Sequence, residues 1–164
     1  MPELVLGCEI CEDLWVADPP STSHALAGAT VIANLSASNE TVSKDAYREL
    51  LVKSTSARLL CGYIYTSAGE GESTQDLVFG GHNLIAENGT LLAQSSRFAT
   101  GILYTDMDVL KISSERRRMG TFGKQPTVSY CKIPFSMELA ETKLERKFAA
   151  HPFVPEDPAL RNRR

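Results

Sequence analysis

The stretch Gly7-Cys8-Glu9-Ile10-Cys11-Glu12-Asp13-Leu14-Trp15 decides how this sequence is interpreted. Apolar residues alternate through residues 3–10, which predicts a strand, and the two carboxylates that follow Cys11 predict a turn. A cysteine at the end of a strand is held rigidly and stays accessible, as a nucleophile must be. A free cysteine is more often a small buried apolar residue, so position alone leaves both interpretations open.

The rest of the chain alternates strands and helices and then turns back on itself. The patterns predict strands over 3–10, 29–35, 62–66, 76–86, 90–97 and 101–107, and helices over 21–28, 44–60 and 108–119. Asn88-Gly89 predicts a tight hairpin turn between two of these strands. Together they indicate an α/β domain with a mixed sheet. From Gly120 the periodicity fades and prolines recur, which predicts an extended tail with one candidate helix over Met137–Phe148.

The helix expected over 44–60 has the clearest pattern. Ser43 is a residue type that caps helices, and Leu50 and Leu51 lie on an apolar stripe that we expect to face the sheet. Arg48 lies off this stripe and is expected to face water.

Composition and charge exclude several classes of function. The 164 residues suffice for one domain with one core, and 43% hydrophobic with 23% charged residues is ordinary for a globular protein. A net charge of −3 gives no reason to expect nucleic acid or an anionic membrane as partner. Of the two basic runs, Arg116–Arg118 is expected on a solvated helix face and 161–164 is a terminus. No apolar run spans a membrane and no signal peptide is visible, so we expect a cytoplasmic protein.

The four cysteines include a C-x-x-C pair, Cys8 and Cys11. Redox pairs of this spacing open a helix, and zinc pairs need a second pair nearby. Here the first cysteine sits within a strand, where residues three apart point to opposite faces. Cys61 and Cys131 are isolated in the sequence, so we expect neither a metal site nor a redox role.

Several further motifs extend the opening stretch. They are the Pro19-Pro20-Ser21 that follows it, Ala33 to Thr41, Gly69 to Phe79, Gly81-His82, Glu87-Asn88-Gly89 and His151-Pro152-Phe153-Val154-Pro155. Together they resemble the glutaminase domain of glutamine-dependent NAD synthetases, a branch of the nitrilase (carbon–nitrogen hydrolase) superfamily. The resemblance implies a partial nitrilase-like αββα sandwich with mixed β-sheets. It also implies that residues 1–119 are the C-terminal half of the glutaminase domain, and that 120–164 are a tail or linker toward an absent synthetase domain.

The resemblance assigns roles to four residues. In this family a cysteine attacks an amide carbon, a glutamate acts as base, and a lysine helps to hold the oxyanion; a thioester forms, ammonia leaves and water releases the acid. By position, Cys11 matches the nucleophile and the backbone N–H of Glu12 matches an oxyanion donor. Ser38 and Lys44 match contacts to the amino-acid end of glutamine. By residue type alone, Ser38 is a loop residue and Lys44 a surface lysine.

The family's glutamate and second lysine precede the nucleophile strand, and Met1 lies only ten residues before Cys11. Glu3 and Glu9 share the strand of Cys11 and cannot replace them. We therefore expect the isolated chain to be inactive and to form a homo-oligomer or to pair with another polypeptide, such as the missing N-terminal half. No cofactor is expected in this chain; ATP, Mg²⁺ and deamido-NAD belong to the synthetase domain.

Three other interpretations remain open. The chain could be a stand-alone amidase of the same superfamily, although the segment from His151 to Pro155 resembles a linker that such an enzyme does not need. It could be a non-catalytic assembly piece that uses the fold only for association. It could also be a cysteine–histidine hydrolase that uses His82, although a histidine after Gly80-Gly81 in a hairpin strand is more often packed in the core.

Overall fold

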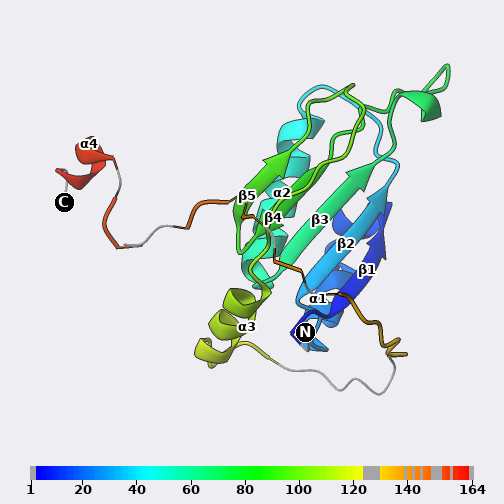
Figure 1. Cartoon of the computed structure of the whole chain (residues 1–164). Helices are drawn as coiled ribbons and strands as arrows, with labels where there is room; N and C mark the ends of the chain where they lie inside the picture. Colours follow the sequence, from blue (N-terminus) through cyan, green and yellow to red (C-terminus); the bar gives the residue numbers. More distant parts are fainter. Residues whose placement is uncertain are drawn as a thin grey trace.

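A single mixed sheet organises the computed structural model, which describes residues 3–123, 130–138, 140–141, 143–144, 146–148, 153–155 and 157–162. The strands lie in sequence order as β1 (Leu6–Ile10), β2 (Val31–Ser36), β3 (Gly62–Ser67), β4 (Leu84–Glu87) and β5 (Thr90–Gln94). Strands β1, β2 and β3 are parallel to one another, and β4 is antiparallel to both of its neighbours, β3 and β5 (Figure 1). The helices are α1 (Pro20–Leu26), α2 (Lys44–Arg58), α3 (Val109–Arg118) and α4 (Pro158–Arg161), with short 3₁₀ turns η1 (Cys11–Leu14) and η2 (Glu70–Glu72).

The parallel strands place their carboxyl ends at one edge of the sheet. Leu6 pairs with Val31, and Val31 pairs with Gly62, so the three strands run in step. The segments that leave this edge are η1, the loop from β2 to α2, and the loop after β3. Such an edge is where open α/β sheets bind ligands.

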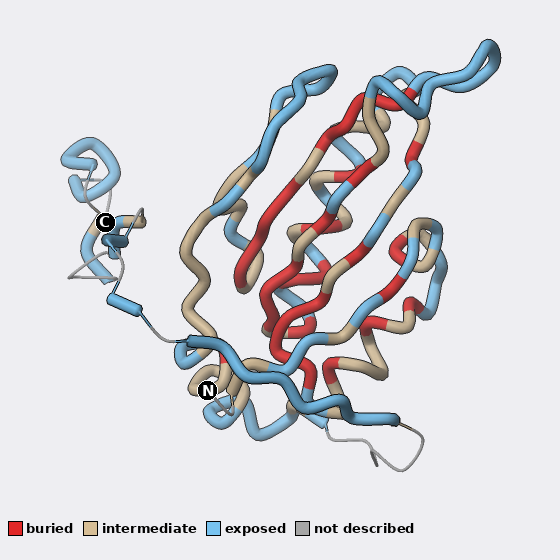
Figure 2. Tube along the Cα trace, turned by 45° about the vertical axis from the view of Figure 1, so that its right-hand side comes forward, coloured by how far each residue is buried: buried red, intermediate tan, exposed pale blue. Residues whose placement is uncertain are grey.

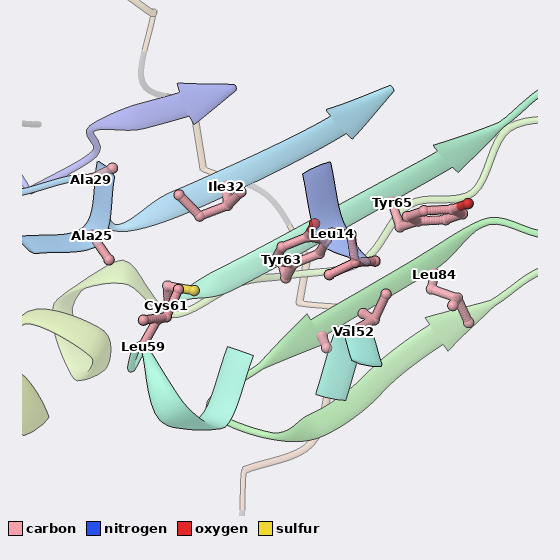
Figure 3. Packing of buried hydrophobic residues seen from close by; sticks show 11 residues of the cluster. Leu14, Ala25, Ala29, Ile32, Val52, Leu59, Cys61, Tyr63, Tyr65 and Leu84 are labelled. Atoms are coloured by element: carbon pink, nitrogen blue, oxygen red, sulfur yellow. The ribbon is translucent and has the colours of Figure 1, made fainter. Parts of the chain in front are cut away.

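The two faces of the sheet differ in burial. Helices α1 and α2 cover one face, where Ile32, Tyr63, Tyr65 and Leu84 are fully buried (Figures 2 and 3). On the other face Leu6, Ile10 and Leu35 are 50%, 68% and 59% exposed, and the loop that includes residues 130–138 crosses part of it (Figure 1). The α/β class with a mixed sheet is thus confirmed. The described residues form one sheet and one covering layer of helices, which is one half of an αββα sandwich.

The prediction for the buried side of α2 holds for Leu51, which packs against the core, and is wrong for Leu50 and Arg48. The side facing the sheet carries Arg48, Val52, Thr55 and Ser56, whereas Leu50 is 58% exposed. The partners of the buried Arg48 charge are Glu40 and Ser38 on the loop before α2 and His82 just before β4, so the polarity of this side is set outside the helix. Ser43 occupies the N-cap position at φ 65°, but its side chain makes no capping hydrogen bond.

Most other elements match the predicted ranges, with three corrections. No strand forms over 101–107, because no neighbouring strand among the described residues provides hydrogen bonds to it. The first hairpin strand begins at Leu84 rather than at residue 76. Arg116 does not face solvent: its guanidinium donates to the carbonyls of Leu59 and Leu60 at 2.9 and 2.8 Å, closing the end of α2.

The tail is described only in part. Within Met137–Phe148 the described residues are not helical, so that candidate helix is wrong there. His151 and Pro152 lie outside the described residues. In the part of the chain that is described, no helix has the length and apolar character needed to cross a membrane.

Candidate functional site

Cys11 lies where β1 turns into η1, in a left-handed backbone conformation with φ 50°. This region is unfavourable for a residue with a Cβ, by about 1–2 kcal/mol. Two hydrogen bonds hold the turn: Asp13 Oδ2 accepts from the N–H of Ile10 at 2.7 Å, and Asn34 Nδ2 donates to the carbonyl of Cys11 at 3.4 Å. The thiol is therefore presented, half-buried, at the end of the strand rather than packed in the core.

The N–H of Glu12 is available for an incoming group. Glu12 is the second residue of η1, and the first N–H groups of a helix have no acceptor within the helix. Its side chain is exposed, while its carbonyl accepts from the N–H of Trp15 at 2.8 Å. This geometry is compatible with the predicted use of the Glu12 backbone as an oxyanion donor.

Ser38 lies on the loop from β2 to α2, and Lys44 is the first residue of α2, at the same edge as Cys11. Ser38 is only 5% exposed, and its N–H donates to Ser67 Oγ at 3.4 Å. Lys44 Nζ donates to Asn39 Oδ1 at 2.7 Å. Burial, followed by the charge of Arg48, lowers the pKa of Lys44, and the carboxylate of Glu40 acts in the opposite direction.

Trp15 connects the turn at Cys11 to the start of α2, a role that sequence reasoning did not assign. The ammonium of Lys44 lies 5.3 Å from the centre of the Trp15 ring, and the centre of the Tyr47 ring, also on α2, lies 5.5 Å from it. A cation at this distance from an indole is attracted to its face. The only sequence signal for this contact is the place of Trp15 in the opening stretch.

Sequence reasoning also missed a polar cluster beneath the loop, which we call the Arg48 cluster. Its members are the buried Arg48 and His82, the partly buried Glu40, and Gln94, which is exposed at the end of β5. His82 is 2% exposed, and its two ring nitrogens contact Arg48 Nη1 at 2.9 Å and Gln94 Nε2 at 2.7 Å. Both nitrogens are engaged, so His82 does not serve Cys11 as a base, and the cysteine–histidine interpretation is not supported.

Two further titratable groups are buried in the core. Glu9 is buried on the helix-covered face, where it accepts from the N–H of Ser21 at 2.8 Å and from the hydroxyl of Tyr63. Burial raises the pKa of the Cys61 thiol to about 12, which keeps it protonated and unreactive. All four cysteines are free, and the described residues contain no group of three potential metal ligands.

Comparisons with known proteins identify the family of this chain. The model of the family described as carbon-nitrogen hydrolase matches residues 1–117. The glutamine-dependent NAD(+) synthetase of Mycobacterium tuberculosis is 46% identical over 168 residues, covering 96% of this chain and 25% of that protein. The corresponding protein of Mycobacterium leprae is also 46% identical, with 94% and 24% covered. The chain thus spans about a quarter of the length of these relatives.

Solved structures share the fold. Saccharomyces cerevisiae Nit3, a member of branch 10 of the nitrilase superfamily, superposes with a TM-score of 0.60 at 22% identity, over 71% of this chain and 42% of Nit3. A carbon-nitrogen hydrolase from Helicobacter pylori G27 superposes with a TM-score of 0.59 at 22% identity, over 70% and 43% of the two chains. From the match of the family model over residues 1–117, we conclude that the chain belongs to the carbon–nitrogen hydrolase family.

Proposed function

We propose that this chain is the glutaminase part of a glutamine-dependent NAD synthetase. In this role it hydrolyses glutamine and supplies ammonia for the amidation of deamido-NAD. The observation that carries the proposal is 46% identity to such synthetases over nearly the whole chain, which includes the turn that presents Cys11.

The proposed reaction begins at Cys11. Its sulfur attacks the amide carbon of glutamine, and the backbone N–H of Glu12 donates to the oxygen that gains charge. The C–N bond breaks, ammonia leaves, and water then cleaves the thioester to release glutamate. Ser38 and Lys44 hold the carboxylate of the substrate through a hydroxyl and an ammonium. We propose that the base and the lysine that helps to hold the oxyanion come from the three quarters of the relatives' length that this chain does not span.

The arrangement of the remaining parts is also proposed. Residues 1–119 act as the C-terminal half of the glutaminase domain, and 120–164 lead to a synthetase domain that binds ATP, Mg²⁺ and deamido-NAD. The exposed side chains of Leu6, Ile10 and Leu35 support a second polypeptide layer over the open face of the sheet, either from the same enzyme or from another copy. The stand-alone amidase interpretation gains no support from the relatives, which are NAD synthetases.

Replacing the nucleophile tests the proposal in the protein extended to the length of its relatives. We expect Cys11→Ala to abolish NAD formation from glutamine and to leave NAD formation from ammonia intact, because the second reaction does not use the thiol. Cys8→Ala is the matched control, since Cys8 lies three residues earlier, on β1, and is exposed. Equal loss of both activities in Cys11→Ala, or equal effects of the two variants, would contradict the assignment.

A further inference from the structure

Arg48 is the largest fully buried side chain in the described structure. Arginine is almost never fully buried unless it is paired, because removing its charge from water costs several kcal/mol. The contacts of the Arg48 guanidinium must therefore offset this cost.

Three partners surround the guanidinium. Nη1 lies 3.0 Å from Glu40 Oε1 and 2.9 Å from His82 Nδ1, and Nη2 donates to Ser38 Oγ at 3.3 Å. The group also lies 6.0 Å from the centre of the Tyr65 ring. Its planar fork of donors can satisfy several acceptors in fixed directions, which a lysine ammonium cannot do.

The contact with Arg48 determines the protonation of His82. A guanidinium only donates, so Nδ1 of His82 must accept, and the neutral imidazole then carries its proton on Nε2. Nε2 therefore donates to the side-chain amide of Gln94, which must present its oxygen to the ring. Burial and the charge of Arg48 lower the pKa of His82, in agreement with a neutral ring. The acceptor at Nδ1 thus holds Arg48 in place.

The same reasoning orients Ser38. Its Oγ accepts from Arg48 on the buried side, so the hydroxyl proton is left to be donated in another direction. Ser38 lies at the carboxyl edge of the sheet, where Lys44 and Cys11 also gather. A hydroxyl that accepts from a buried cation becomes a better donor, because hydrogen bonds in a chain polarise one another.

We infer that Arg48 is a positioning residue of the glutamine site: held by Glu40 and His82, it fixes the Ser38 hydroxyl as a donor toward the substrate carboxylate. The inference rests on the proposed function. It adds Arg48 and His82 to the site as groups that act through Ser38 without touching the substrate.

Two pairs of variants test it in the protein extended to the length of its relatives. Arg48→Lys keeps the charge but not the fork, and Arg58→Lys on the exposed side of the same helix is its control. His82→Asn keeps an acceptor at the position of Nδ1, where it can still accept from Arg48. His82→Gln places its amide at the position of Nε2 instead and leaves Arg48 without this acceptor. We expect Arg48→Lys and His82→Gln to raise KM for glutamine about ten-fold with kcat changed less than about two-fold, and His82→Asn and Arg58→Lys to resemble the parent. If Arg48→Lys does not fold, the two His82 variants carry the test, since both keep the arginine.

The outcomes separate this inference from the proposed function. A parent protein that turns over no glutamine overturns the proposed function. An active parent in which Arg48→Lys leaves KM unchanged, or lowers kcat alone, overturns only the role of Arg48. Equal KM values for glutamine in His82→Asn and His82→Gln would also overturn only the role of Arg48. Nitrogen-15 NMR of His82 gives a readout besides activity: a proton on Nε2 supports the orientation of the cluster, and a proton on Nδ1 overturns it.

Discussion

The open face of the sheet should make the 164-residue chain associate with itself. Leu6, Ile10 and Leu35 are 50%, 68% and 59% exposed there. Full burial of such a side chain contributes about 1.5–3 kcal/mol, so covering the exposed part of all three contributes about 3–5 kcal/mol in each copy. Two copies that share this face would gain about 6–10 kcal/mol, from which association subtracts at least about 4 kcal/mol. In the most favourable case about 6 kcal/mol remains, which corresponds to a dissociation constant of some tens of micromolar.

Replacing Leu35 by Lys perturbs this face at its centre. It removes a contact from each copy and would place two ammonium groups in the shared interface, so we expect association to weaken at least about 30-fold, equivalent to about 2 kcal/mol. Val42→Lys is the matched control, because Val42 is 98% exposed in the loop before α2, away from the sheet. Sedimentation velocity between about 10 and 500 µM measures both variants against the parent.

A parent chain that stays monomeric and folded over this range would refute the reasoning, since the exposed apolar face would then need no partner. Equal weakening by Val42→Lys would also refute it, because the effect would then come from net charge and not from this face.

Three further predictions follow from individual contacts. Lys44→Ala should raise KM for glutamine about ten-fold with little change in kcat, because its contact is the same in substrate and transition state, whereas Lys53→Ala on the same helix should change neither; a fall in kcat at unchanged KM would exclude the role. Arg146→Ala should lower the free energy of unfolding by about 2–3 kcal/mol in urea titrations, because its two bonds of 2.7 and 2.9 Å satisfy the buried carboxylate of Glu87, and a loss under about 0.5 kcal/mol would contradict this. Acidification should destabilise the chain in two steps. The pKa of His82 is lowered from 6.5, so the unfolded chain takes up its proton first and stability falls from about pH 6.5 downward; the pKa of Glu87, which hydrogen bonds hold below 4.5 despite burial, adds a second loss below pH 4.5. His82→Asn should remove the first step only, as chemical denaturation at a series of pH values would show.

Local signals explain what was predictable. The Asn88-Gly89 turn has φ values of 46° and 84°, which the two residue types accept more readily than others, so the hairpin follows from two residues. The turn after β1 is equally local, since Ile10 and Asp13 close it within one motif. Interactions over three or four positions are set by neighbours in the sequence and need no knowledge of the fold.

Predictions failed where the partners are distant. Leu50 fits an apolar stripe, yet it is exposed, because the elements that pack against α2, and not the pattern of the helix itself, decide which of its sides is buried. The run 101–107 has strand-forming residues, but a strand exists only where a neighbour supplies hydrogen bonds. Arg116 looks like a solvated residue in a basic run until the end of α2 provides carbonyls for it.

The sequence by itself determined the class of the fold, the place of Cys11 at the end of a strand, and the resemblance that led to the family. Only the tertiary structure decided which charges are buried. Arg48 and His82 lie 34 positions apart in the chain, and the guanidinium becomes stable without water only when that ring, Glu40 and Ser38 converge on it. No periodicity encodes such a convergence, because the free energy of a buried charge depends on partners that folding brings together.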